Sequence, residues 1–238
     1  MNNKDMYKIV MRQLAKDLNC DISDLHGTDN KTVVVTADEP YNFCHMVCFR
    51  NNLVVSVDEQ LKNFIDLFIS DKEGFRCLED ISLLARELEK YNKTIGLYEA
   101  FVPDISANRQ VNPDFDVVVY WGDDVVKLYD DKRFGMALSY TTEGKKADAV
   151  AVAGYINNEI IGVAGASKDY DTMWQMGYDV VYKHRNKGVA TILGKIITRL
   201  IIDKGIVPYS TLAWSNIASK NTLINIGYKS AWTAIGAD

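Results

Sequence analysis

Six consecutive residues have the types and spacing of a phosphate-binding loop: Arg185-Asn186-Lys187-Gly188-Val189-Ala190. Two cations bring positive charge to the turn, and Gly188 would let the backbone come within hydrogen-bond distance of an anion. If a helix follows, the N–H groups of its first turn have no intrahelical acceptor and converge at the positive end of the helix dipole. Such an arrangement can hold phosphate groups. The alternative for Arg185 is a surface salt bridge.

The flanking elements must position this loop. Apolar residues recur at three- and four-residue spacing after the loop, which predicts an amphipathic helix. Gly205 and Pro208 would end it. Residues 175–181 mix β-branched, aromatic and polar side chains without helical spacing, and are predicted to form a strand. The helix positions are Val189, Ile192, Leu193, Ile196, Ile197, Leu200 and Ile201.

Two common nucleotide-binding motifs, the Walker loop and the three-glycine dinucleotide fingerprint, are absent from the sequence. The pattern present is Arg-x-x-Gly-x-Ala, which resembles the acyl-CoA pyrophosphate loop of the GNAT superfamily of N-acetyltransferases. Asn216-Ile-Ala-Ser219 and Gly227-Tyr228 follow in the order of that family's closing segment. The resemblance covers roughly the second half of the chain. It implies an α+β fold with a mixed sheet flanked by helices.

The resemblance also implies a cofactor site and its ligand, acetyl-CoA, with no metal. Backbone groups of the segment Val180-Val181-Tyr182 would pair with the pantetheine amides like an added strand. The N–H groups from Asn186 to Ala190 would hold the pyrophosphate, and Asn216 would contact the pantetheine arm. Ser219 is also expected at the cofactor site. The acceptor would be an amine whose identity these residues do not specify.

The catalytic residues cannot be carried over from the family. Transfer to an amine needs an uncharged nucleophile, a polarised thioester and a proton for the leaving thiolate. Leu223 stands where many members have a tyrosine, and Trp174 stands where several have a glutamate. We name Asp171, Tyr178 and Asp179 as candidates on or near the strand before the loop.

For each of these candidates the alternative is a surface carboxylate or a packed aromatic ring. Strand alternation places Tyr178 and Asp179 on opposite faces, so at most one is expected to line the cleft unless a bulge intervenes. Tyr209 and Ser215 are further candidates on the next strand. Trp174, Trp214 and Trp232 either wall a substrate pocket or pack the sheet, and packing is the commoner role.

The composition excludes several function classes. The chain has 238 residues, 47% of them hydrophobic and 25% charged, as expected for a globular protein. Its net charge of -5 offers no long-range attraction for nucleic acid or an anionic membrane. Residues 181–238 nevertheless hold eight Lys or Arg and only two acids. This local basic region suits a small polyanion such as coenzyme A.

All four cysteines lie in the first third of the chain. The N-terminus does not have the pattern of a signal peptide, so we expect a cytoplasmic protein with reduced thiols. Cys44, His45 and Cys48 lack a second ligand pair for zinc, which favours packed strand cysteines. No apolar run approaches the roughly 20 residues of a membrane span.

A shift to Ser, Ala, Asn, Arg and Gln between Pro103 and Pro113 predicts a linker. We therefore expect two domains: residues 1–112, a smaller α+β helper domain that could be a degenerate GNAT-like unit, and residues 113–238, a GNAT-like acetyltransferase domain. Strands are expected at residues 32–36, 46–50, 53–57, 94–102, 115–120, 147–155 and 159–166. Helices are expected at residues 6–18, after residue 59, at residues 78–91 and from residue 123 to residue 128.

Local signals accompany these elements. Asn51-Asn52 and Asn157-Asn158 are predicted to be two-residue hairpin turns. Ser56 and Glu59 form a capping-box pattern, and Asp123 is predicted to cap the helix that follows it. Gly154, Gly162 and Gly165 thin the side chains of one hairpin, which lets a backbone or ligand approach closely.

Three functions remain open at this point. The first is an acyl-CoA-dependent N-acyltransferase, most simply acetyl transfer by direct attack in a ternary complex. The second is a non-catalytic acyl-CoA-binding or regulatory module, which Leu223 and Trp174 favour. The third is an α/β scaffold that binds no nucleotide. A homodimer is also an open alternative.

Overall fold

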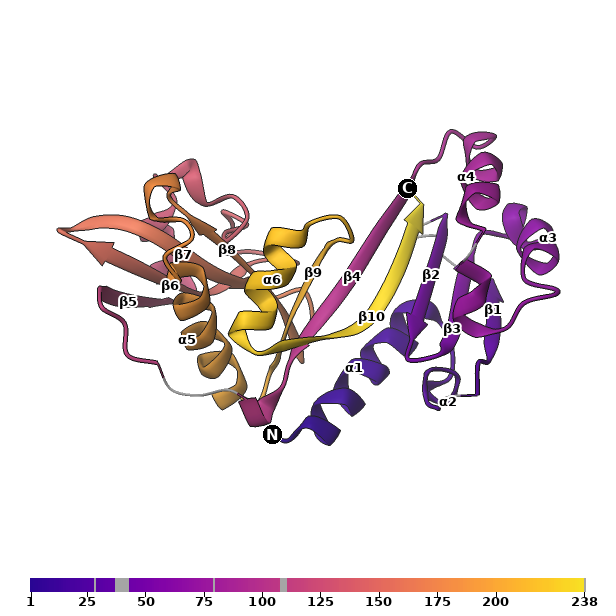
Figure 1. The fold of residues 1–238 in the computed structure, drawn as a ribbon, viewed down its shortest axis with the longest axis horizontal. Coiled ribbons are helices and arrows are strands. Elements are labelled where there is room, and N and C mark those ends of the chain that lie inside the picture. Colours follow the sequence, from indigo (N-terminus) through magenta and orange to yellow (C-terminus); the bar gives the residue numbers. More distant parts are fainter. Residues whose placement is uncertain (28, 37–42, 79, 108–110, 238) are drawn as a thin grey trace. The chain divides into compact units, whose positions relative to one another are not determined.

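A computed structural model describes residues 1–27, 29–36, 43–78, 80–107 and 111–237 of the chain (Figure 1). The fold is α+β, and the chain divides into two compact units. The first comprises Met1–Ile9, Phe101–Thr211 and Asn216–Lys229, and the second comprises Val10–Ala100, Leu212–Ser215 and Ser230–Asp238. The predicted domains, residues 1–112 and 113–238, are segments expected to fold independently. Their existence as such stays a prediction.

The first unit is built on five consecutive strands. Its order is β9-β8-β7-β6-β5, in which β5 to β8 are antiparallel neighbours and β9 joins β8 in parallel. The Asn157-Asn158 turn between β6 and β7 has the positive φ angles, 50° and 65°, that a type I′ hairpin needs. The strands are β5 (Asp116–Trp121), β6 (Asp148–Ile156), β7 (Glu159–Ser167), β8 (Met173–Val180) and β9 (Val207–Ala213).

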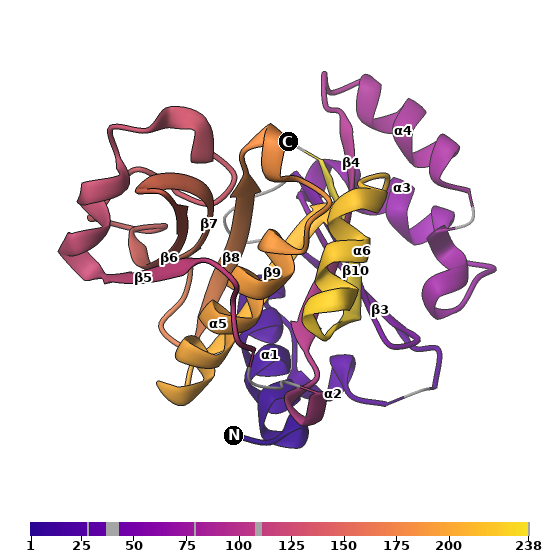
Figure 2. The same cartoon turned by 60° about the vertical axis from the view of Figure 1, so that its left-hand side comes forward.

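Two helices cover one face of this sheet. Helix α5 (Val189–Asp203) contacts β6, β7 and β8, and α6 (Ile217–Ile226) lies beside it (Figure 2). The predicted amphipathic pattern is confirmed, because Val189, Leu193, Ile197 and Ile201 are buried. Shorter 3-10 helices are η2 (Ile105–Ala107), η3 (Gly122–Leu128), η4 (Lys132–Phe134) and η5 (Tyr182–His184).

One predicted helix has a different form. The segment ending at Leu128 is the 3-10 helix η3, with Trp121 at its N-cap and Asp123 inside its first turn. Asp123 therefore does not cap it by a side-chain bond. The φ of 53° at Gly122 turns the chain one residue before Asp123, which moves the start of the helix.

The second unit has the strand order β1-β3-β2-β10. Strands β2 and β3 form a hairpin, β1 adds to β3 in parallel, and β10 adds to β2 in antiparallel register. Three strands contribute residues to both units: β4 (Ile95–Pro103), β9 and β10 (Tyr228–Ala237). Helix α1 (Asn3–Leu18) does so as well. The other elements are β1 (Thr32–Thr36), β2 (Cys44–Phe49), β3 (Asn52–Val57), α2 (Ile22–Leu25), α3 (Glu59–Phe68), η1 (Gly74–Leu78) and α4 (Ile81–Glu89).

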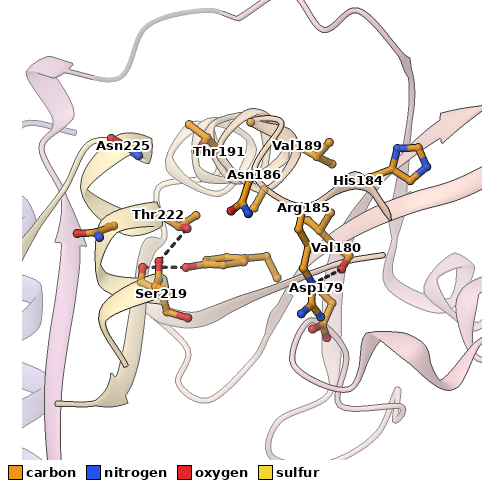
Figure 3. Close-up of a pocket in the computed structure, with 15 residues that line it drawn as sticks. Asp179, Val180, His184, Arg185, Asn186, Val189, Thr191, Ser219, Thr222 and Asn225 are labelled. Carbon is orange, nitrogen blue, oxygen red and sulfur yellow. Dashed lines mark hydrogen bonds between the residues drawn. The ribbon is translucent and has the colours of Figure 1, made fainter. Parts of the chain in front are cut away.

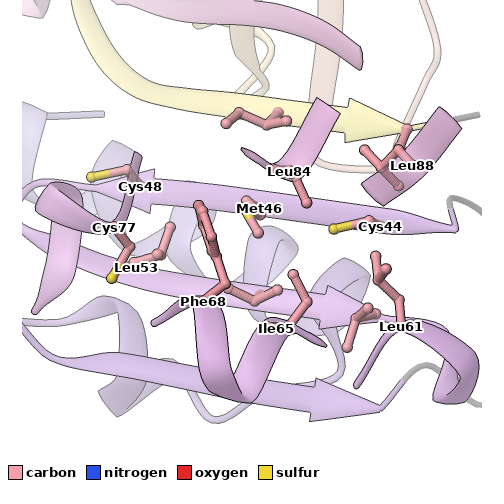
Figure 4. Packing of buried hydrophobic residues seen from close by; sticks show 14 residues of the cluster. Cys44, Met46, Cys48, Leu53, Leu61, Ile65, Phe68, Cys77, Leu84 and Leu88 are labelled. Atoms are coloured by element: carbon pink, nitrogen blue, oxygen red, sulfur yellow. The ribbon is translucent and has the colours of Figure 1, made fainter. Parts of the chain in front are cut away.

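Cysteines belong to the hydrophobic core of this unit (Figure 4). Cys44, Cys48 and Cys77 are buried among aliphatic side chains of β2, β3, α3 and α4. Burial raises the pKa of Cys44 to about 12, so its thiol stays protonated at neutral pH. In the described ranges, no three His, Cys, Asp or Glu side chains gather as they would around a metal ion.

Two local predictions in the second unit are wrong by one or two residues. The hairpin turns at Arg50 and Asn51, because Asn52 pairs with Phe49 inside the sheet. The buried Asn52 side chain accepts from the Lys31 N–H (3.1 Å) and donates to the Asp24 carbonyl (3.0 Å). Those long-range bonds outweigh its turn preference.

The start of α3 is the second difference. Asp58 caps this helix by accepting from the Gln60 N–H over 2.9 Å, whereas Ser56 lies within β3. No helix of the described residues combines the length and the apolar character that crossing a membrane requires.

Candidate functional site

Strand β8 is paired differently on its two sides. Its antiparallel register with β7 extends through Val180. Its parallel register with β9 has only three pairs and ends at Gln175 opposite Tyr209. In the part of the chain that the structure describes, residues 176–180 therefore have no register partner on β9. An unpaired strand edge of this kind can accept an extended chain through main-chain hydrogen bonds.

The basic loop, residues 185–190, follows this edge after the short helix η5. Asn186 and Gly188 both have left-handed backbone conformations, with φ of 59° and 80°. The first backbone hydrogen bond of α5 runs from Ile192 N–H to Gly188 carbonyl over 3.0 Å. The N–H groups of Val189, Ala190 and Thr191 therefore precede the helical ladder, as the first turn of any helix requires. Turns of this type make concave seats for anions.

A cavity of about 640 Å³ lies between the end of β8, the loop and α6 (Figure 3). Its α6 wall carries Ser219, Thr222 and Asn225, and the loop contributes His184 and Asn186. All of its lining residues belong to the first unit. A Cβ atom added at Gly188 would meet nothing within 4 Å, so open space lies above the loop.

The structure brings together most of the residues predicted from the sequence. Those that line the cavity are Tyr178, Asp179, Val180, Arg185, Asn186, Gly188, Val189, Ala190 and Ser219. Those outside its lining are Asp171, Val181, Tyr182, Lys187 and Asn216. Tyr182 is 85% exposed, and Asn216 caps α6 by accepting from the Ser219 N–H over 3.2 Å.

Backbone groups near Val180 already have protein partners. The Val180 carbonyl accepts from Nε of Arg185 over 3.0 Å. Val181 donates its N–H to the Ile161 carbonyl (3.0 Å) and accepts from the His184 N–H (2.8 Å). Val181 is therefore committed to β7 and η5. The Val180 carbonyl accepts its bond from the long side chain of Arg185, and a ligand that displaces this side chain can take its place.

Tyr178 and Asp179 point to opposite faces of β8, as alternation predicts. The Tyr178 hydroxyl donates to the Ser219 carbonyl of α6 over 2.9 Å. The Asp179 carboxylate accepts from the Met136 N–H over 2.7 Å on the other face. The expectation that only one of them lines the cleft is wrong, because the cavity opens at an unpaired strand edge that both faces reach.

Both side chains have shifted titration. Burial raises the pKa of Tyr178, against the opposing effect of hydrogen bonds from Ser219 and Thr222. Burial also raises the pKa of Asp179, opposed by the backbone N–H groups of Met136 and Ala137 and by Arg185. Each group is thus held closer to its neutral form than in water.

A pair of glycines explains why Asp179 meets Met136. Gly165 and Gly177 stand opposite each other in β7 and β8. A Cβ at Gly177 would lie 1.9 Å from the Met136 carbonyl oxygen, and one at Gly165 would lie 2.0 Å from that of Ala137. Because the two glycines have no side chains, the backbone of Met136 and Ala137 can lie directly against β7 and β8. The prediction of close approach at Gly165 is confirmed.

His184 adds a titratable group to the loop. Burial lowers its pKa, and the positive charges of Lys183 and Lys187 lower it further. Lys183 itself is paired with Glu159 over 3.0 Å on the surface. The imidazole is therefore neutral near pH 7. Sequence reasoning did not select His184, although its place beside three cations was a usable signal.

Five further residues that line the cavity were not predicted: Thr191, Ala218, Asn221, Thr222 and Asn225. Thr191 lies in the first turn of α5, and the other four lie on α6. Only the packing of α6 against α5 brings those four to the site. Leu223, by contrast, is fully buried and carries no proton-transferring group.

The remaining candidates lie elsewhere. Asp171 is exposed in the turn before β8. The Tyr209 hydroxyl donates to Oε1 of Gln175 over 3.3 Å. Trp174 lines a different cavity, whereas Trp232 is packed and Trp214 is 58% exposed.

No family model and no curated protein matches this chain. Solved structures do match. A protein from Novosphingobium aromaticivorans that is assigned to the GNAT acetyltransferases is 15% identical, with 60% of this chain and 64% of that one covered and a TM-score of 0.43. This chain thus spans less than two thirds of that protein.

Two further solved structures also match at low sequence identity. A GNAT-family acetyltransferase from Colwellia psychrerythraea is 12% identical over 77% of this chain and 75% of that one, with a TM-score of 0.47. An aminoglycoside N-acetyltransferase in complex with CoA is 16% identical over 51% of this chain and 93% of that one, with a TM-score of 0.37. Likenesses this remote transfer no activity to this chain.

Proposed function

We propose that this chain binds an acyl-CoA in the cavity beside α5 and transfers its acyl group, acetyl in the simplest case, to an amine by direct attack. One observation carries the proposal: the unpaired edge of β8 is followed, after the one-turn helix η5, by the basic loop with its two left-handed residues at the N-terminus of α5. Acyl-CoA has the matching order of groups, with amides along pantetheine and then a pyrophosphate. The loop motif also resembles that of the GNAT superfamily.

The residues of the cavity suit such a ligand. The N–H groups from Asn186 to Ala190 would hold the pyrophosphate, with charge from Arg185 and Lys187. The open space above Gly188 is where phosphate oxygens need room. Acetyl-CoA would supply the acetyl group as a reactive thioester. The Val180 carbonyl would accept a pantetheine amide once the Arg185 side chain turns toward the phosphates.

Proton transfer falls to few groups of this chain. Tyr178 and Asp179 line the cavity, and Asp171 does not, so the first two are the candidates that remain. A raised carboxyl pKa makes Asp179 a better base near neutral pH than an ordinary aspartate. Water could carry the proton instead of either side chain.

A second function has its own support. The Tyr178 hydroxyl and the Asp179 carboxylate each hold a main-chain partner, and Leu223 is a core residue. These bonds fit a non-catalytic acyl-CoA-binding or regulatory module, in which both side chains only shape the cavity. Location in the cytoplasm and a homodimer stay predictions for either function.

Calorimetric titration of acetyl-CoA, and separately of CoA, into the wild type and Gly188→Trp tests both functions. The indole would fill the open space above the loop, so binding should be lost while circular dichroism shows an unchanged fold. Thiol release from acetyl-CoA with a panel of amines then separates the two functions: turnover supports the transferase, and tight binding without turnover supports the module. No binding to the wild type would exclude both.

A further inference from the structure

A second cavity of about 600 Å³ lies in the first unit, where α5 ends. Its wall includes Lys204 and Ile206, which follow α5, whereas the first cavity lies at Val189, where α5 begins. The helix has 15 residues, and at 1.5 Å per residue it spans roughly 22 Å. The two cavities are therefore separate sites.

The sheet register explains the indole groups in this cavity. Trp121 pairs with Val150, Val150 with Ala166, and Ala166 with Met176. Side chains of one such row share a face of the sheet, so Trp121 lies on the same face as Met176. Trp174 precedes Met176 by two residues and shares that face as well.

This face is the one that α5 covers. The sulfur of Met176 accepts from the hydroxyl of Thr198 on α5, with 3.6 Å between the two atoms. The helix ends at Asp203, and beyond it the sheet continues to the start of β8 and the end of β5. Trp121 and Trp174 line the cavity there and are half-buried.

Two lysines stand beside the indoles. The ammonium of Lys204 lies 4.4 Å from the centre of the Trp121 ring, and Lys168 follows β7 at the same cavity. The nearest acids in sequence are engaged elsewhere: Asp203 pairs with Arg199 over 3.0 Å, and Asp169 accepts from the Ser167 hydroxyl over 2.6 Å. Within the described ranges, neither lysine has a carboxylate partner.

Open space adjoins these groups. Gly122, which also lines the cavity, has a φ of 53°, and a Cβ there would meet nothing within 4 Å. A purely structural pair of tryptophans would be covered by neighbouring side chains, whereas these border a cavity wide enough for a small ring system.

We infer that this cavity binds a small aromatic anion, a planar ring bearing a carboxylate or phosphate. The ring would stack on the indole faces of Trp121 and Trp174. The anionic group would pair with Lys168 and Lys204, for which the described residues provide no carboxylate partner. The inference does not depend on the function proposed for the first cavity.

Three probes test the two halves of this recognition: 2-naphthoate, its neutral analogue 2-naphthylmethanol, and cyclohexanecarboxylate, which lacks the aromatic ring. Calorimetry with the full chain should show one-to-one binding of 2-naphthoate with Kd of about 1 mM or tighter. Each of the other two probes should bind at least about fivefold more weakly, because each lacks one interaction worth roughly 1 kcal/mol.

Variants locate the binding. Lys168→Gln and Lys204→Gln should each weaken 2-naphthoate binding about three- to fivefold, whereas Lys127→Gln, in the same unit and paired with Asp124, should not. Trp174→Leu should weaken it as well, and Trp214→Leu serves as the matched control because Trp214 is exposed outside this cavity. Thermal melting checks that each variant is folded.

Several results would overturn the inference. Absence of binding at millimolar 2-naphthoate would do so, as would equal affinity for the neutral alcohol. Loss of 2-naphthoate binding in Gly188→Trp would place the probe in the first cavity instead. Retention there, together with loss of acetyl-CoA binding, is the expected pattern, and it separates this inference from the proposed function.

Discussion

The Tyr178 hydroxyl donates a hydrogen bond to the Ser219 carbonyl over 2.9 Å and thereby joins the unpaired half of β8 to the first turn of α6. The two residues are walls of one cavity. While this bond is made, the Tyr178 proton is not free for transfer. In a non-catalytic module this bond would only stabilise the fold. In a transferase that uses Tyr178 as its acid, the bond must break before the proton is transferred.

Tyr178→Phe distinguishes these roles. Loss of the bond should lower the free energy of unfolding by about 1 kcal/mol, measured by urea denaturation. If Tyr178 also donates the proton to the leaving thiolate, kcat should fall while KM for acetyl-CoA changes little. Tyr155→Phe is the control, since its hydroxyl shares a 2.7 Å bond with Tyr120 and lies outside the cavity lining. A fall of kcat in both variants would point to a general loss of stability.

Gly188→Ala separates backbone strain from obstruction of the cavity. At φ of 80° an alanine is disfavoured, so unfolding should become easier by about 1 kcal/mol. The added methyl group meets nothing within 4 Å, and acetyl-CoA should still bind, within about threefold of wild type because little of the seat is blocked. Calorimetry and chemical denaturation measure the two effects. Strong loss of binding in this variant would mean that phosphate sits closer to Gly188 than the open space suggests.

The loop and its helix could be predicted because their signals are local in the sequence. Gly188 sets the turn, and the three- and four-residue apolar spacing sets α5. The contacts that complete the site are distant in the chain. Tyr178 and Ser219 are 41 residues apart, and Asp179 and Met136 are 43 apart. Strand alternation alone correctly placed the side chains of Tyr178 and Asp179 on opposite faces of β8. It could not show that β9 leaves β8 after Gln175, so both faces reach the cavity.

Asp179→Asn and Asp179→Ala test what the carboxylate does. Asparagine can still accept from the Met136 N–H and has no charge to desolvate, so its stability at pH 7 should equal or exceed that of wild type. Alanine should cost about 1 kcal/mol by removing the acceptor. Because burial raises the pKa of Asp179, the folded state favours the protonated carboxyl. The free energy of unfolding of the wild type should therefore rise relative to that of Asp179→Asn as the pH falls through the raised pKa.

The two Asp179 variants also test whether this residue is the general base. If Asp179 is the general base, Asp179→Asn should abolish turnover while leaving the fold and acetyl-CoA binding intact. Urea denaturation across pH and steady-state kinetics provide the readouts. Equal turnover in Asn and wild type would leave Asp179 as a residue that only positions the Met136 backbone.

Gly177→Ala tests the close contact between the Met136 carbonyl and β8. The new Cβ would stand 1.9 Å from that oxygen, so the segment must lift off β8 and its bond to Asp179 must break. We expect a loss of roughly 2–4 kcal/mol, as for other overpacked or broken buried contacts. Gly135→Ala, at a φ of -67° where an added Cβ meets nothing within 4 Å, is the control for replacing a glycine without a steric clash. Equal stability of the two variants would contradict the close contact.

Proton uptake on ligand binding should report the place of His184. Burial and the charges of Lys183 and Lys187 lower its pKa, so the free protein holds a neutral imidazole near pH 7. A pyrophosphate in the loop would favour the imidazolium and raise this pKa. Acetyl-CoA binding should then take up protons at pH 6 to 7, and affinity should strengthen as pH falls. Calorimetry in two buffers of different ionisation enthalpy measures the uptake.

His184→Gln is the control for this measurement. The ligand's own phosphates still titrate in this variant, so the difference in proton uptake between the two proteins is the contribution of the imidazole. Identical uptake in both proteins would place the phosphates away from His184.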